Sequence, residues 1–298
     1  MTAMYKHLFE EFNLDILSAE CWTATPIMFD GLAPCALYGL LNEMGFMVSC
    51  ESDMHCAMTM ALITDAAVGI GRAVAIKMAQ NHAKLVLADL NFEKLEELKA
   101  ELTTYTNDVL IRKCDISNEN DVRLMTESAY ATFGSIDILV NNAAIWRQWS
   151  SFQNIEISEW QRYFDINIIG TVSVTKSVIG KMLENKYGRI INVASVAGVY
   201  GNANMTSYSA TKGALISFTK ALAKEVSDKG ILVNSVSPGS VSPSDNDDIN
   251  YTEPSELSFM GRTGSDMENA NLICFLASDD ASYISGQNIQ IDGCRKKG

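Results

Sequence analysis

Tyr208 and Lys212 lie four residues apart in a stretch whose apolar spacing predicts a helix, so they are neighbours on one helical face. Of the ten tyrosines in the sequence, Tyr208 alone has a lysine at this offset. A phenol with a pKa of about 10 is a poor base at neutral pH, whereas a nearby ammonium stabilises its phenolate. The pair predicts proton transfer at a substrate oxygen, which must accompany hydride transfer to or from a secondary alcohol.

Two polar residues precede this pair and complete a candidate catalytic set. Ser195 ends an apolar run 13 residues before Tyr208, and its hydroxyl can bind and orient a substrate oxygen. Asn167 lies within a long stretch of helical spacing. The alternatives are an exposed helical pair for Tyr208 and Lys212, and an amide that bonds the backbone for Asn167. We assign Asn167, Ser195, Tyr208 and Lys212 as the catalytic residues.

A pair of glycines predicts a second site. Gly69 and Gly71 follow the apolar run Met60–Thr64 and open a helical stretch. Glycines at a strand-to-helix turn let the backbone approach a diphosphate, and the helix N-terminus offers N–H donors to it. Asp89 ends the next apolar run, 18 residues beyond Gly71, where a ribose-binding carboxylate is expected. Together these residues predict a dinucleotide cofactor.

Asp89 also indicates which dinucleotide is bound. A carboxylate accepts hydrogen bonds from both ribose hydroxyls of NAD and repels the 2′-phosphate of NADP. The sequence has no lysine or arginine between Thr64 and Gly69, and Leu90 and Asn91 after Asp89 are uncharged. We therefore expect NAD to be the preferred cofactor.

The elements that position these residues alternate between strand and helix from residue 60 onward. The expected strands are Met60–Thr64, Lys84–Ala88, Asp108–Arg112, Ile136–Val140, Arg189–Ala194, Ile231–Val236 and Asn288–Ile291. The expected helices include Phe92–Thr104, Asn120–Phe133, Trp160–Glu184, Ser207–Lys229 and Asp266–Leu276. This order predicts an α/β fold of the Rossmann type, a doubly wound parallel sheet with helices on both faces. Ligands of such sheets bind at the carboxyl ends of the strands, where the candidate residues lie.

The whole set of motifs resembles the short-chain dehydrogenase/reductase family over residues 57–298. The motifs are Thr64-x4-Gly69-Ile70-Gly71, Asp115, Asn141-Asn142-Ala143-Ala144, Ser195, Tyr208-x3-Lys212 and Pro238-Gly239. The resemblance implies that Lys212 also binds the nicotinamide ribose and that Asn167 holds a water linking Lys212 to solvent. It further implies that Asp115 and Ile116 contact the adenine. The implied cofactor-binding residues are Thr64, Asp65, Gly69, Ile70, Gly71, Asp89, Leu90, Asp115, Ile116, Asn142, Ala143, Ala144, Tyr208, Lys212, Pro238, Gly239 and Val241.

Two positions depart from the family pattern, which usually has glycine where Asp65 and Ala144 stand. Position 65 favours a residue without Cβ, although aspartate tolerates the left-handed conformation better than most residues. The Asp65 carboxylate either lies near the cofactor phosphates or accepts from the adenosine ribose. In the first case we expect NAD binding to be weakened by about 1 kcal/mol without being abolished.

The composition indicates a globular protein and limits its partners. Of the 298 residues, 47% are apolar and 20% are charged, which is ordinary for such a protein. The net charge of −13 argues against nucleic acid and anionic membranes as partners. Neither a membrane-spanning run nor a signal peptide is expected, and seven cysteines without CxxC spacing predict reduced thiols in the cytoplasm. We expect a small-molecule substrate and a homo-oligomer, a tetramer or a dimer.

Residues 1–59 are expected to be an appendage to a catalytic domain of residues 60–298. The first 60 positions hold one lysine, no arginine and eight carboxylates. Cys21–Ala24, Gly31–Cys35 and Cys50–Asp53 resemble part of the L-fucose/L-arabinose-type sugar isomerase family, in which the carboxylate matching Glu51 binds a divalent metal. The further ligands that such a site needs are missing downstream, so we expect neither a metal site nor isomerase activity.

The substrate class is indicated by the segment Ser240–Met260, which holds five carboxylates and no basic residue. As a substrate lid it disfavours strongly anionic thioesters and favours hydroxyl groups that donate to carboxylates, although a solvated surface loop is the alternative. The isomerase-like fragment agrees with this chemistry, so a sugar, polyol or sugar-acid substrate is favoured. The alternatives are a 3-oxoacyl-thioester or hydroxysteroid reductase, and a catalytically impaired cofactor-binding relative.

Overall fold

The computed structural model describes residues 16–19, 47–50, 59–146, 149–242 and 248–296. The chain divides into two compact units, Met1–Met58 and Thr59–Gly298. In the first unit, strands β1 (Ile16–Ala19) and β2 (Met47–Cys50) pair in parallel. Apart from Cys50, the isomerase-like segments lie outside the described residues.

The second unit is built on a seven-stranded sheet in the order β5-β4-β3-β6-β7-β8-β9, and every strand pairing in it is parallel. The strands are β3 (Met60–Thr64), β4 (Lys84–Asp89), β5 (Val109–Lys113), β6 (Ile138–Asn141), β7 (Gly188–Val193), β8 (Ile231–Pro238) and β9 (Asn288–Ile291). The strand order reverses at β3, which pairs with β4 on one side and β6 on the other. The predicted Rossmann-type sheet is confirmed, with a topological switch point beside β3.

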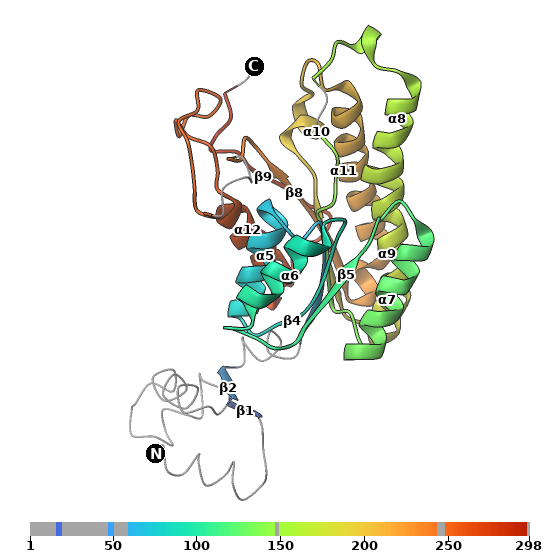
Figure 1. Ribbon diagram of the computed structural model, residues 1–298, viewed down its shortest axis with the longest axis vertical. Helices are drawn as coiled ribbons and strands as arrows, with labels where there is room; N and C mark the ends of the chain where they lie inside the picture. The colour runs from blue at the N-terminus through green and yellow to red at the C-terminus, as the bar shows by residue number, and fades with distance from the viewer. Residues whose placement is uncertain (1–15, 20–46, 51–58, 147–148, 243–247, 297–298) are drawn as a thin grey trace, which may run out of the picture. The chain divides into compact units, whose positions relative to one another are not determined.

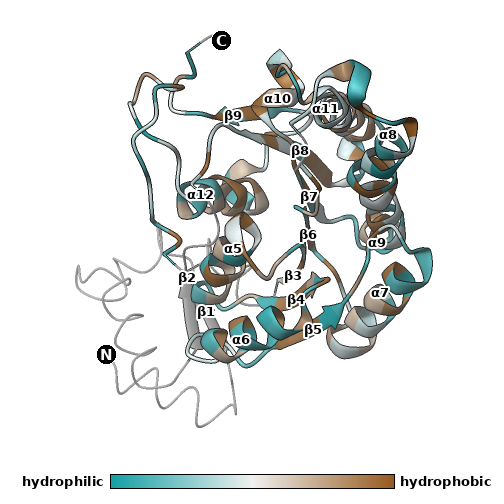
Figure 2. Cartoon of the chain, turned by 45° about the horizontal axis from the view of Figure 1, so that its top comes forward, coloured by the Kyte–Doolittle hydropathy of each residue, from teal (hydrophilic) through white to brown (hydrophobic). Residues whose placement is uncertain are grey.

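Helices cover both faces of this sheet (Figures 1 and 2). One face carries α5 (Gly69–Gln80), α6 (Phe92–Leu102) and α12 (Asp266–Ala277), and the other carries α7 (Glu119–Phe133), α9 (Thr171–Asn185) and α11 (Thr206–Val226). Two shorter helices, α8 (Ile157–Phe164) and α10 (Val196–Tyr200), precede α9 and α11 along the chain. Within the described ranges, no helix is both long and apolar enough to cross a membrane.

Each face of the sheet has its own apolar core, because successive strand residues point to opposite faces. Ile63 of β3 packs in a cluster with Val74, Leu95 and Ile273 from α5, α6 and α12. Its neighbour Leu62 packs in a second cluster with helical residues of α7 and α9. These two cores hold the strands rigidly, so their carboxyl ends form a fixed platform for the site.

The segment that the sequence predicts as one helix, Trp160–Glu184, is interrupted in the structure. A π-helical turn, Asp165–Gly170, separates α8 from α9. The backbone carbonyls of such a turn bond five residues on, so the turn is wider than an α-helical one. Asn167 lies in it and bonds the loop after β6, a contact that hydrophobic spacing cannot reveal.

The strand register aligns the candidate residues at one edge of the sheet. Thr64 at the end of β3 is paired with Ala88, the residue before Asp89, and Asn141 at the end of β6 is paired with Asn192. The turns that follow these strands therefore meet at the switch point, as the sequence order predicts.

Candidate active site

Ser195, Tyr208 and Lys212 come together at the carboxyl end of β7. Ser195 is the N-cap of α10, where its Oγ accepts from the Ala197 N–H at 3.1 Å, and its side chain is close enough to Tyr208 to lower the pKa of the phenol. Tyr208 lies in the first turn of α11, with Lys212 one turn later. The Lys212 Nζ lies 5.7 Å from the centroid of the Tyr208 ring and donates to the Val193 carbonyl at 2.7 Å.

Burial sets the protonation of this group. It raises the pKa of Tyr208 to about 12, while the hydrogen bond from Ser195 opposes that rise. It lowers the pKa of Lys212 to about 8, while the Asp65 carboxylate opposes that fall. At pH 7 the phenol is therefore protonated and the ammonium is largely charged. This state can donate a proton from Tyr208 to a carbonyl oxygen.

Asn167 fixes the loop after β6 against α11. Its Oδ1 accepts from the Ile145 N–H at 2.8 Å, and its Nδ2 donates to the Ile145 carbonyl at 3.0 Å and to Thr211 Oγ1 at 3.1 Å. Thr211 in turn donates to the Tyr208 carbonyl at 2.8 Å. The Asn167 amide thus bonds the backbone, which is the alternative to a catalytic role that the sequence left open. The water relay through Asn167 stays a prediction.

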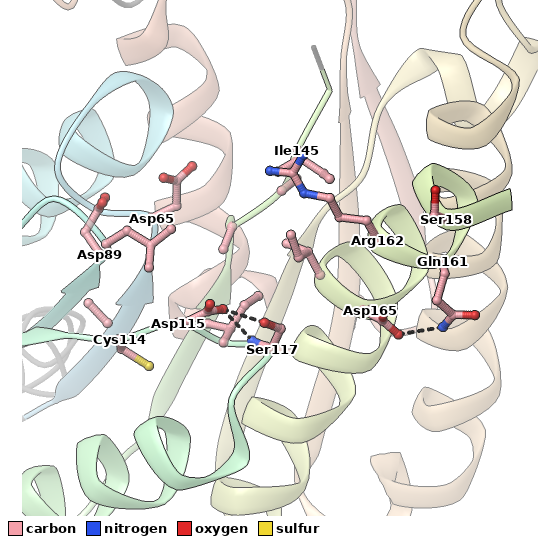
Figure 3. A pocket seen from close by; sticks show the side chains of 16 residues that line it. Asp65, Asp89, Cys114, Asp115, Ser117, Ile145, Ser158, Gln161, Arg162 and Asp165 are labelled. Carbon is pink, nitrogen blue, oxygen red and sulfur yellow. Dashed lines mark hydrogen bonds between the residues drawn. The ribbon is translucent and has the colours of Figure 1, made fainter. Parts of the chain in front are cut away.

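A cavity of about 560 Å³ opens at the switch point (Figure 3), a volume within the range of small-molecule and cofactor sites. Its wall includes seven of the predicted cofactor-binding residues: Asp65, Asp89, Leu90, Asp115, Ile116, Ala143 and Ala144. Ile145 also lines it and is bonded by Asn167, which contacts the Tyr208 backbone through Thr211.

Asp89 presents a fixed carboxylate to this cavity. The residue is 8% exposed, its Oδ2 accepts from the Ala67 N–H at 2.9 Å, and its Oδ1 accepts from the Asn91 N–H at 2.8 Å. Each oxygen keeps a lone pair beyond the backbone bond. A carboxylate held in this way is suited to accept from a pair of ribose hydroxyls.

The turn between β3 and α5 has the form that a diphosphate requires. A Cβ on Gly71 would lie 2.0 Å from the Asp65 carbonyl oxygen, so only glycine fits there. The N-cap of α5, Val68, makes no side-chain cap, and the first turn has no acidic residue. The amides of this helix end are therefore available to an anion from the cavity side. These residues fit a bound dinucleotide.

Asp65 adopts the left-handed backbone conformation that its position was expected to need, with φ of +54°. Its carbonyl oxygen and its Oδ2 both accept from Asn142 Nδ2, at 3.0 Å and 3.4 Å. Thr64 Oγ1 accepts from the N–H groups of Asn142 and Ala143 at 3.1 Å and 3.2 Å. The turn after β3 is thereby joined to the stretch after β6.

Comparison with known proteins identifies the family. The family model described as enoyl-(acyl carrier protein) reductase matches residues 66–294. A 3-oxoacyl-(acyl-carrier-protein) reductase of Thermotoga maritima is 35% identical over 236 residues, which are 78% of this chain and 95% of that protein. The chain belongs to the short-chain dehydrogenase/reductase family. As a short-chain dehydrogenase/reductase it is an oxidoreductase whose family uses NAD or NADP.

Other relatives of this short-chain dehydrogenase/reductase act on different compounds. The cyclohexanol dehydrogenase of an Acinetobacter species is 33% identical over 233 residues, covering 78% of this chain and 93% of that protein. Two solved structures, an NAD⁺-bound xylitol dehydrogenase and a levodione reductase, each have a TM-score of 0.73 and 30% identity. Each match spans 79% of this chain, together with 98% of the xylitol dehydrogenase and 96% of the levodione reductase. The resemblance of residues 1–58 to sugar isomerases receives no support from these matches.

Several predicted residues lie outside the lining of this cavity. Thr64, Gly69, Ile70, Gly71 and Asn142 lie in or beside the turns after β3 and β6, and Ser195, Tyr208 and Lys212 form their own group.

The predicted residues at the end of β8 have structural contacts of their own. The Gly239 N–H donates to the Ile291 carbonyl at 3.0 Å, and a Cβ on Gly239 would lie 2.8 Å from Asp292. Val241 forms a parallel bridge with Gly264. The acidic residues Asp245 and Asp247 of the expected lid lie outside the described residues.

Sequence reasoning missed one wall of the cavity. Ser158, Gln161, Arg162 and Asp165 reach it from α8 and the π-helical turn (Figure 3). Gln161, Arg162 and Asp165 belong to the stretch Trp160–Glu184, which was expected to be one continuous helix, and Ser158 lies just before it. Nothing in the spacing of that stretch indicates that its first turns face a ligand. The signal that was available is their charge, since Arg162 and Asp165 precede Asn167 on the same segment.

Proposed function

We propose that this short-chain dehydrogenase/reductase is an NAD-dependent enzyme that interconverts a secondary alcohol and a ketone, with a sugar, polyol or sugar acid as its substrate. The observation that carries the proposal is the position of Lys212, a buried residue whose Nζ lies 5.7 Å from the centroid of the Tyr208 ring. These groups supply the proton transfer that an alcohol–ketone interconversion requires.

In this proposal, Ser195 and Tyr208 both hydrogen-bond the reacting oxygen of the substrate. For carbonyl reduction, Tyr208 donates its proton to that oxygen, and the Lys212 ammonium stabilises the phenolate that is left. For alcohol oxidation the same proton returns to Tyr208. A bound nicotinamide cofactor would supply the hydride as NADH in reduction and would take it up as NAD⁺ in oxidation. Asp89 would hold its adenosine ribose, and the turn before α5 would hold its diphosphate. Asn167 holds the loop at Ile145 in a fixed position relative to Tyr208.

The preference for NAD is supported by the position of Asp89. Two backbone N–H groups hold its carboxylate at the cavity wall, so it cannot turn away from an incoming 2′-phosphate. We expect kcat/KM to be higher with NADH than with NADPH, and Asp89→Ser to reduce that ratio at least tenfold. A wild-type enzyme that uses NADPH better would contradict the assignment.

The substrate class is supported by the acidic character of the segment after β8 and by the likeness to a xylitol dehydrogenase structure. A second candidate, reduction of 3-oxoacyl thioesters, is favoured by the 35% identity to 3-oxoacyl-(acyl-carrier-protein) reductases. A panel of polyols, sugars, 2-keto-3-deoxy sugar acids, cyclohexanol and acetoacetyl thioesters separates the two. We expect the highest kcat/KM among the hydroxylated compounds, and a higher value for a thioester would establish the second candidate.

Three further assignments belong to the proposal. Residues 60–298 form the catalytic domain and residues 1–59 a non-catalytic appendage. The enzyme assembles as a homo-oligomer, a tetramer or a dimer, and works in the cytoplasm with reduced thiols. Light scattering of the full chain tests the assembly, and a monomer would contradict it.

A further inference from the structure

The cofactor cavity is strongly acidic for a site that must bind a diphosphate. Four carboxylates line it, those of Asp65, Asp89, Asp115 and Asp165. Arg162 is the one basic side chain among its described lining residues. Like charges in a partly enclosed site repel an anion, so the diphosphate of a dinucleotide needs a positive group close by.

Asp65 increases the need for a positive group near the diphosphate, because it lies in the turn that approaches the diphosphate. Its carbonyl oxygen lies 2.0 Å from where a Cβ on Gly71 would be, so the residue sits directly against the N-terminus of α5. The uncapped amides of that helix end attract the phosphates, and the Asp65 carboxylate on the cavity wall repels them.

Arg162 is placed to offset this charge from the opposite wall. It extends from α8 toward Ile145 (Figure 3), across the cavity from the turn after β3. Its side chain is 63% exposed, and its ion pair with Glu159 on the same helix is long, at 3.7 Å. An exposed pair of this kind contributes little, so the guanidinium can exchange it for a stronger partner.

We propose that Arg162 is a cofactor-binding residue that pairs with the diphosphate of the dinucleotide from the α8 side and offsets the carboxylate of Asp65. The inference rests on the proposed cofactor site. A guanidinium presents parallel N–H donors that match phosphate oxygens, and its exposed position lets it close on the ligand after entry.

Calorimetric titration of the full chain with NADH, ADP and adenosine tests this inference without measuring turnover. We expect Arg162→Gln to weaken NADH and ADP binding at least tenfold at low ionic strength and to leave adenosine binding unchanged, because adenosine has no phosphate. Arg162→Lys should retain part of the affinity. Arg123→Gln is the matched control, because Arg123 is an exposed arginine of α7 paired with Glu127 at 2.8 Å, and it should change nothing.

A double variant tests the link to Asp65. We expect Asp65→Gly in the Arg162→Gln background to recover most of the lost ADP affinity. Unchanged ADP binding in Arg162→Gln, or an equal loss for adenosine and ADP, would overturn the inference while leaving the proposed function intact. A wild-type chain that binds neither NADH nor NADPH would overturn the proposed function itself.

Discussion

The group formed by Ser195, Tyr208 and Lys212 and the candidate cofactor cavity share one edge of the sheet, yet they are held in different ways. Lys212 is buried, and its ammonium donates to a carbonyl at the end of β7. The cavity is instead only partly enclosed, and its charged residues come from several separate turns and from α8.

This difference has a physical consequence. Burial raises the pKa of Tyr208 to about 12 and lowers that of Lys212 to about 8. Side chains exposed to water would keep pKa values near their ordinary ones. In the cavity, solvent partly screens each charge, so a single substitution should change the affinity for the cofactor by a factor on the order of ten. Substitutions in the buried group should therefore abolish turnover, whereas those in the cavity should tune affinity.

The largest effect is expected for Lys212→Met, which keeps the volume and removes the charge. The phenolate of Tyr208 then has no neighbouring ammonium, so kcat should fall by about 10²-fold or more. Lys220→Met, an exposed lysine two turns later on α11, is the control and should leave kcat unchanged. Equal kcat values for the two variants would show that proton transfer by Tyr208 does not need the charge of Lys212.

A smaller but still clear effect is expected for Asn167→Ala. The substitution leaves the Ile145 N–H and carbonyl without their partners, so the free energy of unfolding should fall by about 1–3 kcal/mol. Urea denaturation measures this change, and the exposed Asn107→Ala should shift the midpoint little. If Asn167→Ala had the stability of the wild type, the loop after β6 would not depend on this amide.

Asp65→Gly should act on both regions at once. Removing the carboxylate should tighten NADH binding about fivefold, as expected for a screened repulsion of about 1 kcal/mol. Because Asp65 raises the pKa of Lys212, its loss lowers that pKa. The fall in carbonyl reduction above about pH 8 should then begin at lower pH.

Asp65→Asn separates the charge from the backbone effect, since asparagine also tolerates the left-handed conformation. It should reproduce both changes seen for Asp65→Gly. A looser complex with NADH in either variant would mean that the Asp65 carboxylate accepts from the cofactor instead of repelling it.

The smallest effect is expected at the start of α12, for Glu268→Gln. Glu268 makes two hydrogen bonds with Arg262 and one with the Ser265 N–H, which lower its pKa to about 2. Its folded-state pKa is thus below the unfolded value of 4.5, so its stabilisation is present above that pH and is lost as the pH falls toward 2. The exposed pair limits the change at pH 7 to under about 1 kcal/mol, measured by urea denaturation. A loss that is as large at pH 2.5 as at pH 7 would contradict this origin.

The sequence was sufficient to predict the strands and the proximity of Tyr208 and Lys212, and insufficient to predict the wall of the cavity that α8 forms. Apolar runs such as Ile231–Val236 must be buried between two helix layers, so their type and order follow from composition. The spacing of Tyr208 and Lys212 is fixed by one helix. Arg162 lines the cavity from α8, the helix that precedes the π-helical turn, and local spacing carries no information on which helices face a cavity.

The central claim is that Tyr208 donates and accepts the proton at the substrate oxygen. Its most direct test is kcat for NADH-dependent turnover of Tyr208→Phe on the best substrate of the panel, beside the fully exposed Tyr283→Phe as control. We predict that Tyr208→Phe loses about 10²- to 10⁴-fold in kcat while it still binds NADH, and that the control keeps its rate. Retention of more than about a few per cent of turnover by Tyr208→Phe would contradict the assignment.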